Sequence, residues 1–181
     1  LDAKVEKMTI QNHAENNEFL NENFELAKVD IDPNLVNGSK VLLEYTVKVK
    51  NQGNVEGCAD KIVDYLTDDL EFNSSLNPDW YMEADGNIYT RSLKGDVIKP
   101  GETRELKLIL IKNMTDTNTG LVHNSFEICA SSNEKGIKDI DSIVGNRLEE
   151  DDLANADALI GISTGLFDSK IPIILTSILL L

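Results

Sequence analysis

The sequence is poor in cysteine, in basic residues and in glycine, and each shortage excludes a class of protein. Two cysteines, Cys58 and Cys129, are too few for a disulfide-framed miniprotein, and they lack the spacing of a zinc site. With 17 Lys and Arg against 32 Asp and Glu, the net charge of −15 would repel a nucleic acid. Only 11 glycines exclude a collagen-like chain. A chain of 181 residues, 41% of them hydrophobic, must therefore be stabilised by a packed core.

Hydrophobic periodicity predicts β-strands along most of the chain, because apolar residues alternate with polar ones at a period of two. The clearest run is 41–49, where Leu43, Tyr45, Val47 and Val49 fall on one face. Further strands are expected at 58–66, 70–72, 87–93, 104–111, 121–130 and 158–163. Turn signals at 51–54 and 99–102 separate them. Short strands divided by turns predict an all-β fold, a β-sandwich with a long acidic loop before its last strand.

The two ends of the chain differ from this pattern. Residues 1–22 are rich in Asn and Glu with weak periodicity, and we expect a linker or the end of a preceding module there. The sandwich is expected to span 23–165. Residues 166–181 are interpreted as the start of a truncated C-terminal membrane anchor, because the uncharged run 171–181 has about half the length that a bilayer requires. The alternative is an edge strand or a helix packed on the domain.

Motifs that would carry catalysis are missing from the sequence. It contains no P-loop, Rossmann fingerprint, HExxH motif or EF-hand loop. Residues 161–165 match G-x-S-x-G, but a nucleophile elbow has its histidine downstream, and the last histidine, His123, precedes Ser163. We therefore expect a protein that is not an enzyme.

Several short motifs, in this order, resemble the DUF11 conserved repeat domain of bacterial surface proteins. They are 45–54, 62–66, 70–72, 99–102, 123–128, 139–146 and 150–152, within a region from about Phe24 to Gly165. The departures are Ile143-Val144, where the family often has Thr-Pro, and Thr67, where a Pro usually stands. The resemblance implies an immunoglobulin-like β-sandwich without enzymatic activity, repeated in tandem on the surface of Gram-positive or other bacteria. No LPxTG motif for wall attachment is present.

The expected function is a non-catalytic stalk or adhesion module of the bacterial cell surface, extracellular and membrane-anchored through its C-terminal segment. Its partners would be neighbouring surface-protein domains and possible host or extracellular ligands. The alternative is a ligand-binding adhesin domain for protein or carbohydrate. It would use Trp80 and Tyr81 on the polar stretch 73–86, because exposed aromatic residues anchor many interfaces.

A calcium site is a further hypothesis. The acidic, unpatterned stretch 133–157 carries Asp139, Asp141, Asn146, Asp151 and Asp152, whose hard oxygen atoms suit Ca²⁺ if the loop folds back on itself. The alternative is a solvated acidic linker, which is the usual nature of a charge run.

Strand parity suggests an intramolecular isopeptide bond. Lys28 shares a face with Phe24 and Leu26, Asp64 with Ile62 and Leu66, and Asn124 with Phe126 and Ile128. Burial would lower the pKa of the lysine and raise that of the aspartic acid. A neutral Lys28 amine could then attack the Asn124 side-chain carbonyl, polarised by protonated Asp64, and release ammonia.

Alternatives to this bond remain at the sequence level. Glu44 is the substitute acid, although it alternates onto the other face of its strand. Lys28 could instead extend its ammonium to an edge and pair with Asp64 while Asn124 caps a turn. Cys58 and Cys129 could pair or remain free thiols, and nothing in the sequence fixes the distance between them.

Overall fold

The computed structural model describes residues 1–12, 16–21, 26–137 and 142–163. Within these ranges all regular structure is β-strand. The strands form largely antiparallel sheets that do not close into barrels, which is compatible with a β-sandwich. The predicted all-β fold is therefore confirmed.

The first sheet contains the longest strands. Its order is β2 (Asn16–Leu20), β1 (Asp2–Gln11), β4 (Lys40–Lys50), β9 (Thr103–Asn113) and β6 (Glu71–Phe72), and every pairing is antiparallel. β4 and β9 pair along their whole length, from Lys40 opposite Asn113 to Lys50 opposite Thr103. This ladder is the longest strand pairing of the sandwich, and one of its faces is apolar and points into the core.

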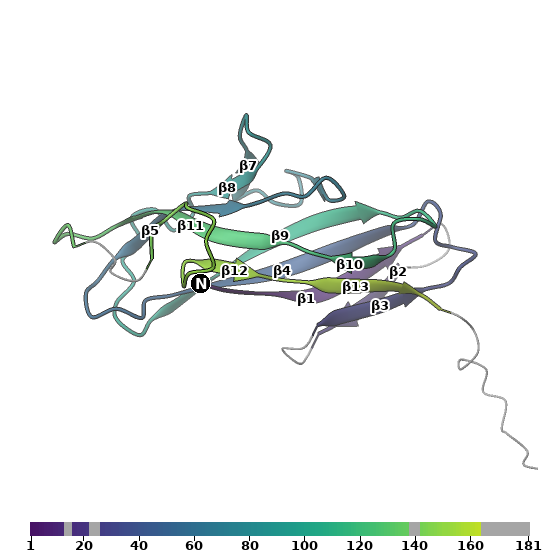
Figure 1. Ribbon diagram of the computed structural model, residues 1–181, viewed down its shortest axis with the longest axis horizontal. Coiled ribbons are helices and arrows are strands. Elements are labelled where there is room, and N and C mark those ends of the chain that lie inside the picture. Colours follow the sequence, from purple (N-terminus) through teal and green to yellow (C-terminus); the bar gives the residue numbers. More distant parts are fainter. Residues whose placement is uncertain (13–15, 22–25, 138–141, 164–181) are drawn as a thin grey trace, which may run out of the picture.

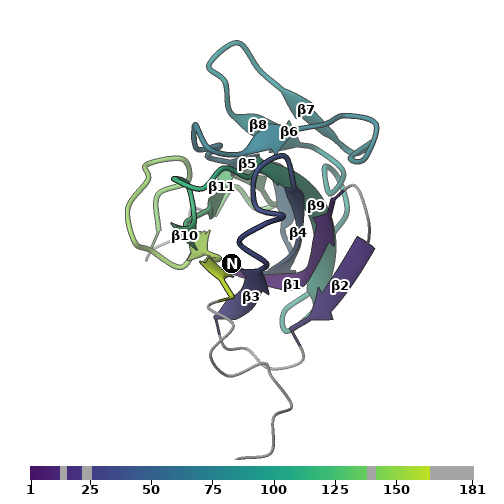
Figure 2. The same cartoon turned by 90° about the vertical axis from the view of Figure 1, so that its right-hand side faces the viewer.

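Two further sheets lie across the core from β4 and β9 (Figure 2). The larger has the order β12 (Leu153–Asn155), β11 (Ser125–Ser132), β5 (Cys58–Asp64), β8 (Ile88–Thr90) and β7 (Trp80–Met82). The smaller has the order β10 (Gly120–Val122), β13 (Ala158–Ile162) and β3 (Ala27–Ile31), in which β13 and β3 run parallel.

An aromatic cluster joins the sheets at the centre of the core. Phe126 of β11 contacts the Tyr45 ring of β4 edge-on, with 5.6 Å between centroids, and the Trp80 ring at 6.4 Å. The Trp80 indole Nε1 donates a 2.7 Å hydrogen bond to the Lys107 carbonyl oxygen of β9, which ties β7 across to the first sheet. Tyr45 and Phe126 are fully buried, so the cluster excludes water between the layers.

The interpretation of residues 1–22 as a linker is wrong where they form β1 and β2. β1 lies between β2 and β4, and it buries Val5, Met8 and Ile10. A β-bulge between Val5 and Lys7 shifts the register, so the buried residues before and after it differ in parity. This bulge explains why the run does not show a period of two in the sequence.

Most of the other predicted strands are confirmed, with shorter bounds for several of them. The run 121–130 is divided, because β10 ends at Val122 and β11 begins at Ser125, each in a different sheet. The turn at 99–102 is also confirmed. Gly101 has φ +82° and the Glu102 amide donates to the Lys99 carbonyl oxygen at 2.9 Å, as a type II turn requires.

The first strand starts, and the last strand ends, at points well separated along the long axis. Figure 1 shows β1 starting beside β12, whereas β13 runs along the long axis toward the other end. No helix in the described ranges is long and apolar enough to cross a membrane. The expected anchor at 166–181 lies outside the described residues.

We expect Phe126→Ala to lower the free energy of unfolding by about 3–5 kcal/mol, because it leaves a cavity between Tyr45 and Trp80. Leu121→Ala is the control, since that side chain is 61% exposed and its loss should change stability by less than about 0.5 kcal/mol. Equilibrium urea denaturation measures both values. Similar losses in the two variants would contradict the central place of Phe126.

Candidate functional site

A buried carboxyl–carboxamide pair lies beside the aromatic cluster. Asp64 is the last residue of β5, and Asn124 stands just before β11, so the pairing of these strands brings the two side chains together. Both residues are fully buried, and Asn124 Nδ2 donates a 2.6 Å hydrogen bond to Asp64 Oδ2. The predicted burial of Asp64 and Asn124 on the core face is confirmed.

Burial also changes the protonation of this pair. It raises the pKa of Asp64 to about 7, and the hydrogen bond from Asn124 opposes that rise only in part. Asp64 Oδ1, Asn124 Oδ1 and the Tyr45 hydroxyl are buried and accept or donate no hydrogen bond among the described residues. A protonated Asp64 has one O–H to donate, and such a bond would satisfy one of these groups.

Lys28 does not join the pair, and the prediction that it faces the core is wrong. In β3 the buried face consists of Ala27, Val29 and Ile31, whereas the Lys28 side chain is 57% exposed and forms an ion pair with Asp30 at 3.6 Å. Leu26, which shares the face of Lys28, is itself half exposed. The prediction counted parity from Phe24 and Leu26, which precede β3, whereas within the strand the apolar residues alternate with the charged Lys28 and Asp30.

Glu44, the substitute acid, lies on the outer face of β4, as its parity predicts. It forms ion pairs with Lys107 at 2.9 Å and Lys7 at 3.4 Å. The described arrangement therefore brings no lysine to Asn124 from the predicted set. Because Lys28 lies on the exposed face of β3, the Asp64–Asn124 pair in the described structure is a hydrogen-bonded cross-link between the end of β5 and the start of β11.

A second buried acid lies at the end of the sandwich where the chain enters. Asp152 precedes β12, is only 4% exposed, and has both carboxylate oxygens without a hydrogen-bond partner among the described residues. Burial, together with the nearby charges of Glu127, Glu150 and Asp151, raises the pKa of Asp152 to about 6. Its backbone carbonyl accepts a 2.9 Å hydrogen bond from the Ile128 amide, which fixes its place beside β11.

Glu127 anchors the loop that carries Asp152. It is fully buried, accepts a hydrogen bond from the Tyr65 hydroxyl and accepts a second, at 3.0 Å, from the Arg147 amide. Arg147 adopts φ +60° and places its guanidinium over the Tyr65 ring at 4.2 Å. The sequence analysis did not identify Glu127, because a glutamate in an alternating strand is typical of a solvated face.

The structure brings together only part of the predicted calcium set. Asp151 and Asp152 are adjacent in the sequence. Asn146, in contrast, accepts a hydrogen bond from the Leu148 amide with its Oδ1 and donates one to Glu150 from its Nδ2. Asp139 and Asp141 lie outside the described residues. Among the residues that the structure describes, no group of three or more His, Cys, Asp or Glu side chains could hold a metal ion. Calcium binding stays a prediction.

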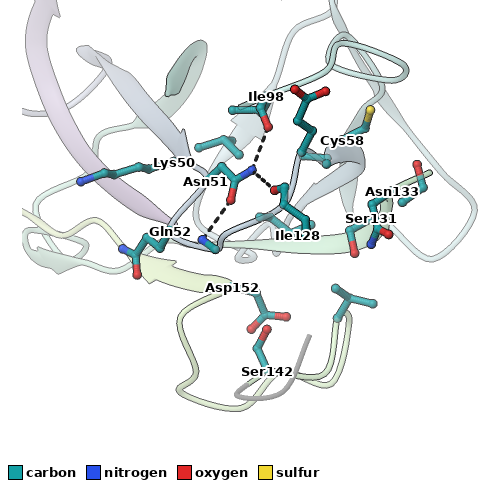
Figure 3. A pocket seen from close by; sticks show the side chains of 18 of the residues that line it. Lys50, Asn51, Gln52, Cys58, Ile98, Ile128, Ser131, Asn133, Ser142 and Asp152 are labelled. Carbon is teal, nitrogen blue, oxygen red and sulfur yellow. Dashed lines mark hydrogen bonds between the residues drawn. The ribbon is translucent and has the colours of Figure 1, made fainter. Parts of the chain in front are cut away.

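Asp152 is one of the residues that line a cavity of about 620 Å³. The cavity lies between the loop that follows β4, the end of β11 and the loop that precedes β12 (Figure 3). Figure 3 shows Asp152 and Ser142 pointing toward one another, with Ile128 and Asn51 on the neighbouring wall. The cavity could not be predicted from the sequence, because its walls come from three distant segments.

The alternative ligand site around Trp80 is not supported by the placement of that residue. Trp80 is 4% exposed and belongs to the core, so it is not an exposed anchor. Tyr81 is 37% exposed and lies against Tyr89, with ring centroids 6.2 Å apart. The Tyr89 ring in turn carries the Lys61 ammonium over its face at 3.8 Å.

A Ser–His–Asp arrangement occurs on the surface and was not predicted. His123 Nδ1 lies 2.6 Å from Asp157 Oδ1, and His123 Nε2 lies 3.1 Å from Ser125 Oγ. The Ser125 hydroxyl donates to Asn155 Oδ1 at 2.8 Å, so its proton is not directed at the imidazole. The imidazole is 53% exposed. A triad works through a hydroxyl that gives its proton to histidine beside an oxyanion site, so this geometry does not indicate acyl transfer.

Cys58 and Cys129 are free thiols in the structure. Cys58 is opposite Ser132 in the β5–β11 ladder, and Cys129 stands at the irregularity between Ile128 and Ala130. The Cys129 thiol donates to the Lys61 carbonyl oxygen at 3.4 Å. The two cysteines are therefore offset along the ladder by several residues, which favours the free-thiol alternative.

Comparison with known proteins adds no relative, since no family model, no curated protein and no solved structure matches this chain. Function must therefore be argued from the fold and the residues themselves.

We expect the stability of the Asp64→Asn variant, measured relative to that of the wild type, to increase as the pH rises. The folded-state pKa of Asp64 is raised to about 7, above its usual value, so the stability contributed by its protonated form is complete below about pH 4 and is lost as the pH rises to 7. Because Asn cannot ionise, the melting temperature of the Asp64→Asn variant should exceed that of the wild type by about 5 °C or more at pH 8.

Calorimetric melting from pH 4 to pH 8 measures this difference. Asp60→Asn, on the same strand, is the matched control for the loss of one negative charge, and its offset from the wild type should stay constant. A constant offset for Asp64→Asn as well would show that the buried carboxyl does not control the pH dependence.

We expect the intact mass to equal the sum of the sequence, with no deficit of one ammonia, because Lys28 lies on the exposed face of β3. Mass spectrometry of the purified full chain measures this. A deficit that disappears in Lys28→Ala, and persists in the control variant Lys40→Ala, would contradict the observed orientation and restore the isopeptide bond.

Proposed function

We propose that the chain is a non-catalytic, load-bearing module of a bacterial cell-surface protein, serving as a stalk or adhesion domain. The observation that carries this proposal is the course of the chain, in which β1 starts beside β12 and β13 runs along the long axis away from that point (Figure 1). A module with this course can be strung between neighbours and transmit a pulling force along its strands.

The strand pairing determines how such a force would act. Pulling on Leu1 draws β1 along its own axis against β4, to which it is paired from Asp2 to Gln11. Pulling beyond Ile162 draws β13 along its axis against β3 and β10. Both terminal strands are therefore loaded in shear, in which all hydrogen bonds of a ladder resist together. Unzipping, in contrast, would break the ladder hydrogen bonds one pair at a time.

The surface chemistry is consistent with a module outside the cell. A net charge of −15 keeps the chain soluble and opposes association with polyanions. The ordered motifs that resemble the DUF11 domain support this proposal, because that resemblance implies tandem repeats on Gram-positive or similar bacterial surfaces. Neighbouring domains of the same surface protein are the proposed partners, and the segment 166–181 is the proposed membrane connection.

Single-molecule pulling tests the proposal by comparing two directions in one protein. Cys58 and Cys129 are replaced by serine, and new cysteine handles are placed either at Leu1 and Ser163 or at Asp32 and Ser163. Asp32 and Ser163 follow Ile31 and Ile162, which are paired at the same end of parallel strands, so the second pair unzips the β3–β13 ladder.

We expect a several-fold higher unfolding force for the Leu1–Ser163 pair than for the Asp32–Ser163 pair at the same loading rate. Forced unfolding is governed by the unfolding barrier, so the difference reports on the direction of load and not on equilibrium stability. Equal forces in the two directions would remove the mechanical argument for a stalk.

A further inference from the structure

The cavity beside Asp152 has the composition of a binding site, and the residues that line it indicate which kind of ligand it would bind. Its volume, about 620 Å³, lies within the range of cavities that take small molecules or side chains. Its inner wall is apolar and consists of residues at the open end of the core, Val49, Ala59, Ile98 and Ile128. Polar residues of the surrounding loops form the rim (Figure 3).

The polar side chains of the rim differ in how many of their hydrogen-bonding atoms already have a partner. Asn51 is fully committed, because its Nδ2 donates to the Val55 and Ile98 carbonyl oxygens and its Oδ1 accepts from the Gly53 amide. Asp152 is the exception, with two buried carboxylate oxygens that accept no hydrogen bond among the described residues. A buried carboxylate in this state is costly unless a cationic donor reaches it.

The cations that line the cavity do not supply that donor. The Leu1 α-ammonium donates to the Asp151 carbonyl oxygen and not to the Asp152 carboxylate. The Lys50 side chain points away from Asp152 in Figure 3. Glu127, Glu150 and Asp151 add negative charge around Asp152 and so increase the attraction for a cation.

We propose that this cavity binds a protonated primary amine carried on an aliphatic chain. The ammonium would donate hydrogen bonds to the two free oxygens of Asp152, and the methylene chain would lie on Ile98 and Ile128. A charge-assisted hydrogen bond of this kind is stronger than a neutral one. The site does not depend on the stalk function, and each can fail without the other.

The shape and donor set favour an amine over a metal ion. Asp152 is the one buried acid among the described residues that line the cavity, whereas Ca²⁺ takes six to eight oxygen ligands. The cavity is also far larger than an ion, and its apolar wall suits methylene groups. Two sources share the amine chemistry, namely a free aliphatic diamine and the lysine side chain of another protein.

The test is titration calorimetry of the full chain at pH 7.5 with four probes. These are 1,5-diaminopentane, a peptide with one central lysine, 1-pentanol and calcium chloride. Asp152→Asn keeps the shape of the side chain and removes its charge. Glu149→Gln removes one charge from the same loop at an exposed position outside the cavity lining, and it is the matched control.

We expect saturable binding of an amine probe, no binding of pentanol, and affinity reduced about tenfold to a hundredfold in Asp152→Asn but unchanged in Glu149→Gln. Binding of diaminopentane alone identifies a free diamine as the ligand class, and binding of the peptide identifies a lysine side chain. Absence of amine binding, or equal amine affinity in Asp152→Asn, overturns the proposal. Asp152-dependent binding of calcium that displaces the amine overturns it in favour of a metal site.

Methyl NMR of the wild-type chain keeps the proposal falsifiable if Asp152→Asn does not fold. Diaminopentane or the peptide should shift the methyl signals of Ile98 and Ile128 and leave those of Ile160, deep in the core near β10 and β3, unchanged. Shifts spread evenly over the isoleucines, or none at all, would contradict binding in the cavity.

Discussion

Contact between Phe126 and its two aromatic neighbours is the interaction on which the rest of the molecule depends. Tyr45 comes from the first sheet and Trp80 from the edge of the second, so the Phe126 ring joins both layers to the middle of the core. The same packing encloses Asp64 and Asn124. Because water cannot reach that pair, its protonation and hydrogen bonding become properties of the fold. The buried pair and the aromatic cluster therefore form one unit.

Much of the fold could be predicted from the period-two pattern, and the failures have a common physical origin. Parity placed Tyr45, Asp64 and Asn124 correctly on the core face. It failed in β1, where the bulge after Val5 changes the face of every later residue. It failed again at Lys28, because parity was counted from Phe24 and Leu26, which precede β3, whereas within β3 the apolar residues Ala27, Val29 and Ile31 form the buried face. Parity assumes a regular strand with known ends, whereas bulges and strand ends are set by the sheet.

The candidate sites were less accessible from the sequence, because their walls come from separate segments. Asp152 was identified as an acidic oxygen donor, but its burial depends on the pairing of β12 with β11 and on the Glu127 contacts with Tyr65 and Arg147. The sequence around Trp80 is typical of a loop, whereas in the structure Trp80 lies in β7, and the pairing of β7 with β8 directs its side chain into the core. Local composition thus identified the chemistry of these residues and not their surroundings.

The two buried acids show how position in the sandwich decides what a buried carboxyl group can do. Both have a raised pKa, chiefly because of burial. Asp64 lies at the centre, where Asn124 donates a hydrogen bond to it, and it can lower the cost of its burial by holding a proton. Asp152 is among the residues that line a cavity of about 620 Å³ at the end of the sandwich, and both of its oxygens are buried without a hydrogen-bond partner among the described residues. The cost of burying Asp64 is therefore reduced within the core by Asn124 and a proton, whereas the cost of burying Asp152 is one that the proposed amine would reduce.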